Sequence, residues 1–133
     1  MTARPLLALP LILWLGACGA LERKDQAGCR IPEDYEAITR TELRDGHFYY
    51  VARIDRHGSI TWSGAVVDLP TFRSYAKQVA SLRPDAGRLS LQVQQKAPCD
   101  TVVVVRQSMV AAGLCRQGRC AEAAWDFKGP IVY

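Results

Sequence analysis

Residues 68–94, DLPTFRSYAKQVASLRPDAGRLSLQVQ, decide the fold because they join a helix pattern directly to a strand pattern. Asp68 is placed to cap the helix, since its carboxylate can accept hydrogen bonds from the free amides of the first turn. Pro70 is tolerated there, where those amides lack partners. The helix shows one apolar stripe, formed by Leu69, Phe72, Ala76, Val79 and Ala80. RPDAG ends the helix, and the clean alternation that follows predicts a strand with Leu89, Leu91 and Val93 facing inward.

The residues before this stretch predict a β-hairpin. Residues 47–55 (HFYYVARID) predict a half-buried strand, with Phe48, Tyr50, Ala52 and Ile54 on one face. RHGS at 56–59 predicts a turn, and SITW at 59–62 resumes a strand. Ser63 and Gly64 give another turn signal, while residues 35–43 fit a short helix or irregular structure.

Residues 98–113, which follow it, carry conflicting signals for a strand and for a helix. Four consecutive valines at 102–105 favour a strand, but Pro98 and Asp100 look like a helix start. Helical spacing and the stop signal of Gly113 favour a helix buried on a broad face, with Val102, Val105, Met109 and Ala112 on its stripe. A last strand is expected from the alternation of Ala121, Ala123, Trp125 and Phe127, closed by Gly129 and Pro130.

The predicted element order is therefore β-β-α-β-α-β. This order indicates an α+β fold, in which a small sheet carries two helices packed on one face.

The N-terminal stretch at residues 6–19, LLALPLILWLGACG, is too short for a membrane span, which needs roughly 20 apolar residues. Leu15-Gly16-Ala17-Cys18 resembles the bacterial lipobox. The resemblance implies cleavage before Cys18 and acylation of its thiol, so that the protein is held to the membrane through lipid on Cys18. A plain signal peptide that happens to precede a cysteine is the alternative.

These signals divide the chain into three parts. Residues 1–17 form a lipoprotein signal peptide, and residues 18–46 a lipidated tether and linker, since 19–34 are polar. Residues 47–133 form the domain. The expected location is the periplasmic side of the cell envelope. Because Gly19 is not the Asp that tends to retain lipoproteins at the inner membrane, the outer membrane is favoured.

Four further cysteines, an even number in a small exported chain, predict disulfides. Gly118 lets CRQGRC turn back on itself, which favours Cys115–Cys120 and leaves Cys29–Cys99. A zinc site is the alternative, but the two histidines, His47 and His57, stand at no ligand spacing, so no metal is expected. No C-x-x-C redox pair occurs.

The charge distribution and the motifs argue against a nucleic-acid-binding protein and against an enzyme. The chain carries 17 Lys and Arg against 13 Asp and Glu, scattered without a basic run, so no nucleic-acid partner is expected. His57 and Ser59 are close together, but in a predicted turn. Asp55 and Asp68 are a strand end and a helix cap rather than an acid and base pair. No catalytic residue, enzyme activity or cofactor is therefore expected.

The ordered elements of residues 52–114 resemble the periplasmic domain of the ExbD/TolR family of biopolymer-transport accessory proteins. The family's hairpin motif G-x-I-x-x-x-G matches Gly58, Ile60 and Gly64. Its Leu-started helix, alternating strand, Pro-led valine-rich helix and terminal A-G-[LI] match Leu69, Leu89–Gln94, Pro98–Val105 and Ala112-Gly113-Leu114. The resemblance implies a domain that dimerises and contacts partner proteins or the cell wall.

Two departures limit what the resemblance implies. Family members keep a transmembrane helix with a carboxylate, whereas residues 6–17 contain no Asp or Glu, and the extra cysteines are also uncommon there. We therefore expect a lipid-anchored binding or adaptor module linked to biopolymer transport or envelope energy transduction. Its expected partners are a second copy of the chain and a membrane transport-complex protein or peptidoglycan. The alternatives are a structural cell-wall-associated lipoprotein, and a small hydrolase or protease-inhibitor-like protein.

Overall fold

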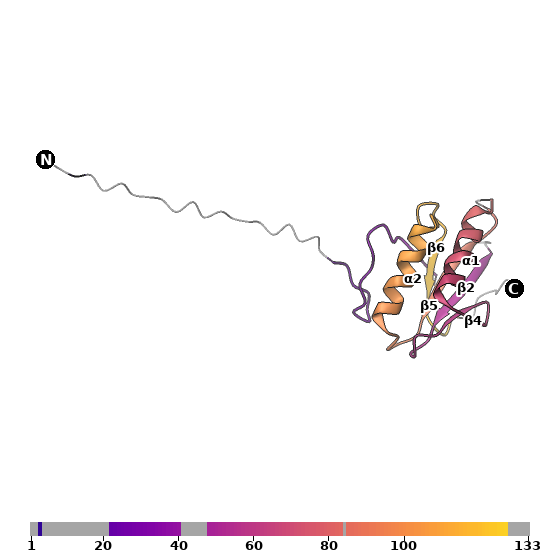
Figure 1. Cartoon of the computed structure of the whole chain (residues 1–133), viewed down its shortest axis with the longest axis horizontal. Helices are drawn as coiled ribbons and strands as arrows, with labels where there is room; N and C mark the ends of the chain where they lie inside the picture. The colour runs from indigo at the N-terminus through magenta and orange to yellow at the C-terminus, as the bar shows by residue number, and fades with distance from the viewer. Residues whose placement is uncertain (1–2, 4–21, 41–47, 84, 128–133) are drawn as a thin grey trace.

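The structure is a computed structural model that describes residues 3, 22–40, 48–83 and 85–127. A six-stranded mixed sheet has the strand order β1-β6-β5-β2-β3-β4, and both helices lie side by side on one of its faces (Figure 1). The elements in chain order are β1 (Ile38–Arg40), β2 (Tyr49–Ile54), β3 (Ile60–Trp62), β4 (Ala65–Val67), α1 (Leu69–Ser81), β5 (Arg88–Val93), α2 (Cys99–Ala111) and β6 (Cys120–Ala123).

The predicted α+β class is confirmed, and all six predicted elements are present in the predicted order. Two short strands were not predicted. β4 extends the β2–β3 hairpin, and β1 pairs in parallel with β6 where a short helix or irregular chain was expected. β2, β5 and β6 run parallel to one another, so the sheet is parallel in its middle and antiparallel at the β3–β4 end.

Helix α1 follows the sequence pattern closely. The Asp68 carboxylate accepts a hydrogen bond from the Thr71 N–H at 2.8 Å, which satisfies a free amide of the first turn. Phe72, Ala76 and Val79 are buried against the sheet. The predicted apolar stripe is therefore the face that α1 turns to the core.

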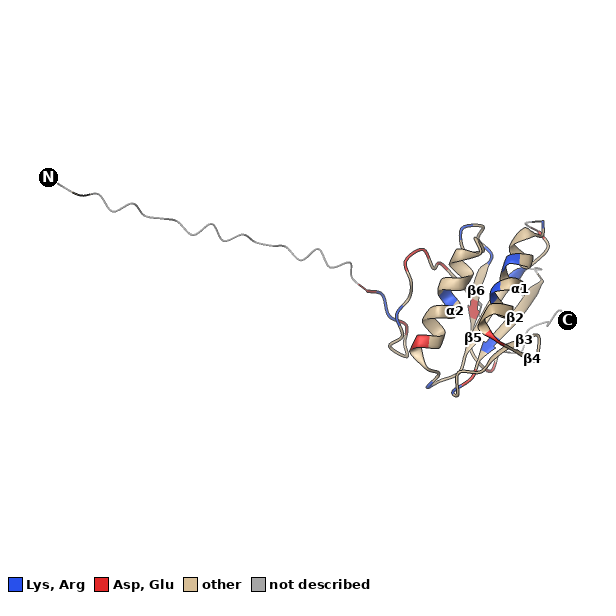
Figure 2. Cartoon of the chain, in the orientation of Figure 1, with Lys and Arg blue, Asp and Glu red and all other residues tan. Residues whose placement is uncertain are grey.

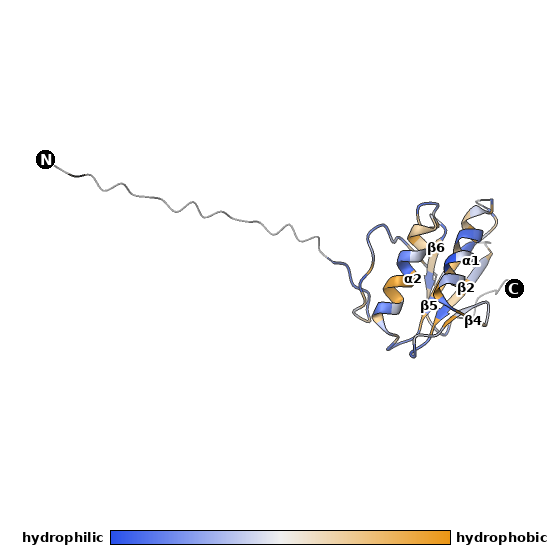
Figure 3. Ribbon diagram, in the orientation of Figure 1, coloured by the Kyte–Doolittle hydropathy of each residue, from blue (hydrophilic) through white to orange (hydrophobic). Residues whose placement is uncertain are grey.

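Helix α2 resolves the ambiguous valine-rich stretch in favour of a helix. Val102, Val105 and Met109 are fully buried, and Gly113 takes a left-handed backbone with φ +86° directly after the helix. The valines are tolerated because the helix is buried between α1, the sheet and the N-terminal segment, where packing outweighs weak helix propensity. Figure 3 shows the hydrophobic turns of this helix in orange.

The main core lies between the helices and the sheet. It is built from the inward residues of the central strands, of which Ala52, Ile54, Leu89 and Leu91 are fully buried. Cys120 of β6 and Phe72 of α1 close it on two sides. None of the helices in the described part of the chain is both long and apolar enough to cross a membrane.

The prediction that residues 47–55 form a half-buried strand is wrong, because β2 is buried on both faces. Tyr49, which alternation places away from the helices, is fully buried, and Val51 is 7% exposed. The chain after β6 reaches this second face. There the Arg53 guanidinium lies 3.7 Å from the Trp125 ring centre and donates to the Trp125 carbonyl at 2.7 Å. β2 is central because β5 pairs on one side and β3 on the other.

The last strand is shorter than its alternation predicted. β6 ends at Ala123, and the Phe127 N–H donates to the Ala124 carbonyl at 3.0 Å, so this part of the chain turns. Trp125 and Phe127 continue the apolar alternation of the sequence, but both lie beyond the end of β6 and are of intermediate exposure. The predicted closing signal at Gly129 and Pro130 lies outside the described residues.

The N-terminal segment 22–40 is folded onto the domain, which corrects the expectation that residues 18–46 are a tether and linker. Lys24 and Arg30 form an antiparallel bridge, and Tyr35 is 4% exposed. The indigo segment lies alongside α2 in Figure 1. Residue Cys18, the leader residues 4–17 and the remaining linker residues 41–46 lie outside the described residues, as does His47.

Candidate binding surface

The outermost strand β4 forms one open edge of the sheet, and we call β4 together with Trp62 and Tyr75 the β4 edge surface. The turn before β4 consists of Ser63 and Gly64, whose φ angles are +48° and +88°. Two left-handed residues between paired strands are typical of a type I′ hairpin turn. This turn sets the register in which Trp62 faces Ala65 and Thr61 faces Val66.

The backbone of Val66 is directed to the open edge. In an antiparallel pair, hydrogen-bonded and non-hydrogen-bonded residue pairs alternate, and the pair next to a two-residue turn is hydrogen-bonded. The Thr61–Val66 pair is therefore non-hydrogen-bonded, and the Val66 N–H and C=O point away from β3. The side chain of Val66 is 76% exposed, and β4 carries no charged residue.

Aromatic rings line the helix side of this edge. The Trp62 ring centre lies 5.3 Å from that of Tyr75 and 5.7 Å from that of Phe72, both in edge-on geometry, and 6.2 Å from that of Tyr50. Phe72 is fully buried, whereas Tyr75 is 36% exposed. A rigid aromatic cluster with a solvent-exposed rim offers contact area at little entropic cost.

Together these features suit the addition of a strand from another chain. An unpaired edge offers main-chain hydrogen bonds to an extended peptide, and adjacent side chains select it. Natural proteins usually protect such an edge with charged residues or proline, and β4 has neither, although its length of three residues limits the pairing. The sequence contained a signal for β4, since a two-residue turn followed by AVV is a hairpin pattern.

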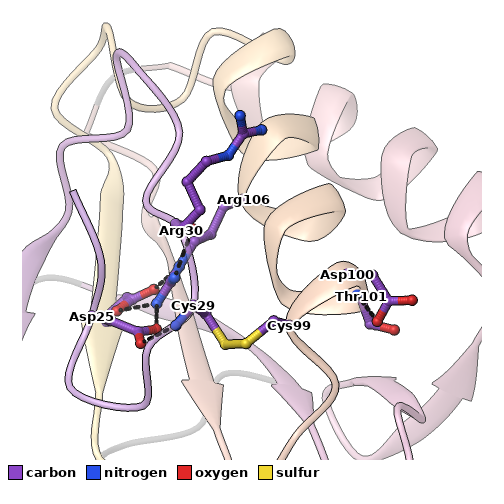
Figure 4. Close-up of a disulfide and its surroundings, with 8 residues drawn as sticks. Asp25, Cys29, Arg30, Cys99, Asp100, Thr101 and Arg106 are labelled. Atoms are coloured by element: carbon purple, nitrogen blue, oxygen red, sulfur yellow. Dashed lines mark hydrogen bonds and ion pairs between the residues drawn. A yellow bond between two sulfur atoms is a disulfide. The ribbon is translucent and has the colours of Figure 1, made fainter. Parts of the chain in front are cut away.

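The prediction of disulfides is confirmed, and the pairs are the favoured ones. Cys29 bonds to Cys99, 70 residues away, and Cys115 bonds to Cys120, five residues away. The first bond ties the N-terminal segment to the first residue of α2 (Figure 4). The second closes the turn between α2 and β6.

A buried ion network lies next to the Cys29–Cys99 bond, and sequence reasoning missed it. The Arg106 side chain, 2% exposed, pairs with the Asp25 carboxylate at 2.9 Å and with the Glu122 carboxylate at 2.8 Å. Asp25 also accepts from the Cys29 N–H at 2.9 Å (Figure 4). Arg106 is the only Lys or Arg within α2, a helix that Figure 2 shows mostly in tan. The network therefore joins the N-terminal segment, α2 and β6.

Tyr35 completes this network. Its hydroxyl donates to Glu122 Oε1 at 2.8 Å, and the Arg106 guanidinium carbon lies 5.5 Å from its ring centre. Burial raises the pKa of Tyr35 well above its ordinary value, and the Glu122 carboxylate raises it further. The phenol therefore stays protonated as a hydrogen-bond donor at neutral pH. Such a satisfied network is typical of a structural joint rather than of an acid–base site.

The His57–Ser59 turn has the structural role that its sequence suggested. Asp55 Oδ1 accepts from the His57 and Ser59 backbone N–H groups, both at 2.9 Å.

Asp68 caps the N-terminus of α1, and the hydrogen bond that it accepts from Thr71 lowers the pKa of its carboxyl group. The residues that the structure describes contain no group of three or more His, Cys, Asp or Glu side chains that could hold a metal ion.

Comparison of the chain with models of protein families, with curated proteins and with solved structures gives no match.

Proposed function

We propose that this protein is a lipid-anchored component of the bacterial cell envelope whose domain acts as a binding or adaptor module on the periplasmic side. The Cys29–Cys99 disulfide carries this proposal. Such bonds persist in oxidising compartments and are rare in the cytosol. Together with the lipobox-like Leu15–Cys18, the disulfide supports an exported domain attached through lipid on Cys18.

The folded N-terminal segment limits how far the domain can stand from its anchor. Four residue steps separate Cys18 from Glu22, where the described segment begins. An extended chain spans at most about 3.6 Å per residue, so the anchor and the segment lie within about 14 Å of each other. A lipidated Cys18 would thus hold the domain against the membrane surface, where a membrane-embedded partner is within reach.

The class of partner follows from the resemblance to the ExbD/TolR periplasmic domain. The order of hairpin, helix, strand, helix and strand supports that resemblance, and with it a role linked to biopolymer transport or envelope energy transduction. The proposed partners are a second copy of the chain and a membrane transport-complex protein or peptidoglycan. The β4 edge surface is the contact region that the geometry favours. The alternative is a structural, cell-wall-associated lipoprotein, which the stabilising disulfides would equally suit.

The first prediction concerns the lipid. Cys18→Ala is expected to abolish labelling of the protein by radioactive palmitate in growing bacteria, because the acylated thiol is gone. Cys115→Ser is the matched control, since it removes a cysteine that is bonded to Cys120 in the folded domain, and should leave the label in place. Label that persists in Cys18→Ala, or that is absent from the unaltered protein, would contradict the proposed anchor.

The second prediction concerns the β4 edge surface. A photoreactive amino acid at Ala65 is expected to yield specific protein adducts in cells, whereas the same group at Gln78, exposed on α1, should not. Adding Val66→Lys should remove the adducts, because a charge on an edge strand opposes pairing. The thermal midpoint should hardly change, since Val66 is 76% exposed.

Mass spectrometry of the adducts separates the two candidate functions. Adducts with one membrane protein or with a second copy of the chain support the adaptor. Equal adducts from Ala65 and Gln78, or adducts only with cell-wall fragments, would instead favour the structural lipoprotein.

A further inference from the structure

A cavity of about 340 Å³ opens at the end of the domain where both helices begin. It is lined by Gly58 of the β2–β3 turn, Ile60 of β3, Leu69 of α1, and Asp100, Thr101 and Val104 of α2. None of these residues belongs to the β4 edge surface or to the Arg106 ion network. The cavity is therefore a separate feature of the molecule.

The cavity combines an apolar floor with a polar rim. Ile60, Leu69 and Val104 supply aliphatic surface, and Asp100 and Thr101 supply a carboxylate and a hydroxyl. Asp100 and Thr101 lie on the side of α2 turned away from the Cys29–Cys99 bond (Figure 4). The turn approaches α2 closely, since a Cβ on Gly58 would lie 3.4 Å from both Pro98 and the Thr101 hydroxyl.

The size of the cavity limits what it can hold. Ligand sites for small molecules are usually about 300–1,000 Å³, so this one stands at the lower limit. It is far larger than a single water needs, roughly 30 Å³. It has room for one long side chain.

The charge at the rim indicates a cation. The Asp100 carboxylate is exposed and accepts only the Thr101 N–H at 3.0 Å, and no described basic side chain pairs with it. The other acidic groups of buried clusters, Asp25 and Glu122, are by contrast both paired with Arg106. Asp100 also occupies the first turn of α2, where a carboxylate offsets the attraction of a helix N-terminus for anions.

Asp100 is the one charged residue among those that line the cavity. Asp68 directly precedes Leu69, but its carboxylate caps α1 and does not line the cavity. The basic residues Arg56 and Lys96 are exposed on neighbouring turns but do not line the cavity. An anionic ligand would therefore meet the Asp100 carboxylate without a cation in the cavity lining to pair with.

We infer that this cavity binds one lysine or arginine side chain of a partner protein. The hydrocarbon stem lies on Ile60, Leu69 and Val104, and the cationic head reaches the Asp100 carboxylate. Long basic side chains commonly bury the apolar stem and keep the charged head exposed. The inference rests on the proposed adaptor function for the existence of the partner. It adds the chemistry of one contact, at a place distinct from the β4 edge surface.

The test uses the full chain with both disulfides formed and labelled with ¹⁵N. It is titrated with Nα-acetyl-lysine N-methylamide, and the matching norleucine and glutamate derivatives serve as apolar and acidic probes. The lysine probe is expected to shift the amide signals of residues 58, 60, 69, 101 and 104 in a saturable manner, and more strongly than the other two.

Two variants separate charge from shape. Asp100→Asn keeps the shape and the hydrogen-bond acceptor, and should weaken lysine binding about fivefold, the upper range for a partly exposed ion pair. Asp85→Asn, an exposed carboxylate after the other end of α1, should leave binding unchanged. Val104→Phe should fill the cavity and abolish the shifts, with thermal unfolding as the check that the variant is folded.

The inference is overturned if the lysine probe produces no localised shifts, or if norleucine binds as well and Asp100→Asn has no effect. Tighter binding of the glutamate probe would overturn it as well. The titration needs no partner, so its failure leaves the cross-linking result at Ala65 intact. Failure of the cross-linking, in turn, leaves the lysine titration valid as a property of the cavity.

Discussion

Replacing Cys29 and Cys99 together by serine is expected to lower the free energy of unfolding by about 4 kcal/mol. The two residues are 70 positions apart, so the bond removes much of the freedom of the unfolded chain. For a domain of this size, the loss corresponds to a fall of about 20 °C in the thermal midpoint. Thermal and denaturant unfolding of the oxidised protein measure it.

The second disulfide supplies the matched control. Cys115 and Cys120 are five positions apart, and the same chain-entropy argument gives a loss of only about 2 kcal/mol for their replacement. The Cys29/Cys99 variant should also lose hydrogen-exchange protection in residues 22–40 first, because the bond fastens that segment to α2. Equal losses in the two double variants, or an unchanged midpoint without Cys29–Cys99, would show that the segment is not held in this way.

Arg106→Leu is expected to destabilise the domain by about 3 kcal/mol. Removing one partner of a buried ion pair typically costs about 3–5 kcal/mol, because the remaining charge is left without compensation. We expect the lower end of this energy range, because the Asp25 and Glu122 side chains are 20% and 28% exposed and can be partly hydrated once Arg106 is gone. Denaturant unfolding at neutral pH measures the change.

Two further variants show whether the loss comes from the ion network. Lys77→Leu changes an exposed basic residue of α1 and should shift stability by no more than about 0.5 kcal/mol. Adding Glu122→Leu to Arg106→Leu should recover part of the lost stability, because an uncompensated carboxylate is then removed. If Arg106→Leu behaves like Lys77→Leu, the network contributes nothing to the fold.

The sequence predicted those elements whose local signals agree with their tertiary environment. In α1 the cap, the proline position and the apolar stripe all point to the same helix, and the structure contains it. In α2 the valines conflicted with the start and stop signals, and the signals at Pro98 and Gly113 decided correctly. Proximity in the chain and the even cysteine count were enough to favour the observed disulfide pairs.

What the sequence did not predict depends on contacts between distant segments. β1 is three residues long and exists because β6 lies next to it, so its own pattern carries little information. The polar composition of residues 19–34 suggested a tether. The Cys29–Cys99 disulfide, the ion pair of Asp25 with Arg106, and a hydrogen bond from Arg106 to the Arg30 carbonyl hold its described part, from residue 22, to α2 instead. Burial of Tyr49 on the second face likewise depends on strand order, which alternation within β2 does not reveal.

The candidate site was less accessible to sequence reasoning than the fold. Val66 is one apolar residue among many in the chain, and its importance comes from the position of β4 at the end of the strand order. Asp100 was recognised only as part of a helix start. Its place at the rim of a cavity requires the β2–β3 turn and α1 to meet α2.

The intact mass of the protein, extracted from bacterial membranes without reductant, tests the central proposal most directly. We predict a chain that begins at Cys18, carries covalent lipid on that residue, and weighs four hydrogens less than its reduced form, two for each disulfide. A chain that still contains residues 1–17, without lipid and with free thiols, would contradict the proposal of an exported, cross-linked and lipid-anchored domain.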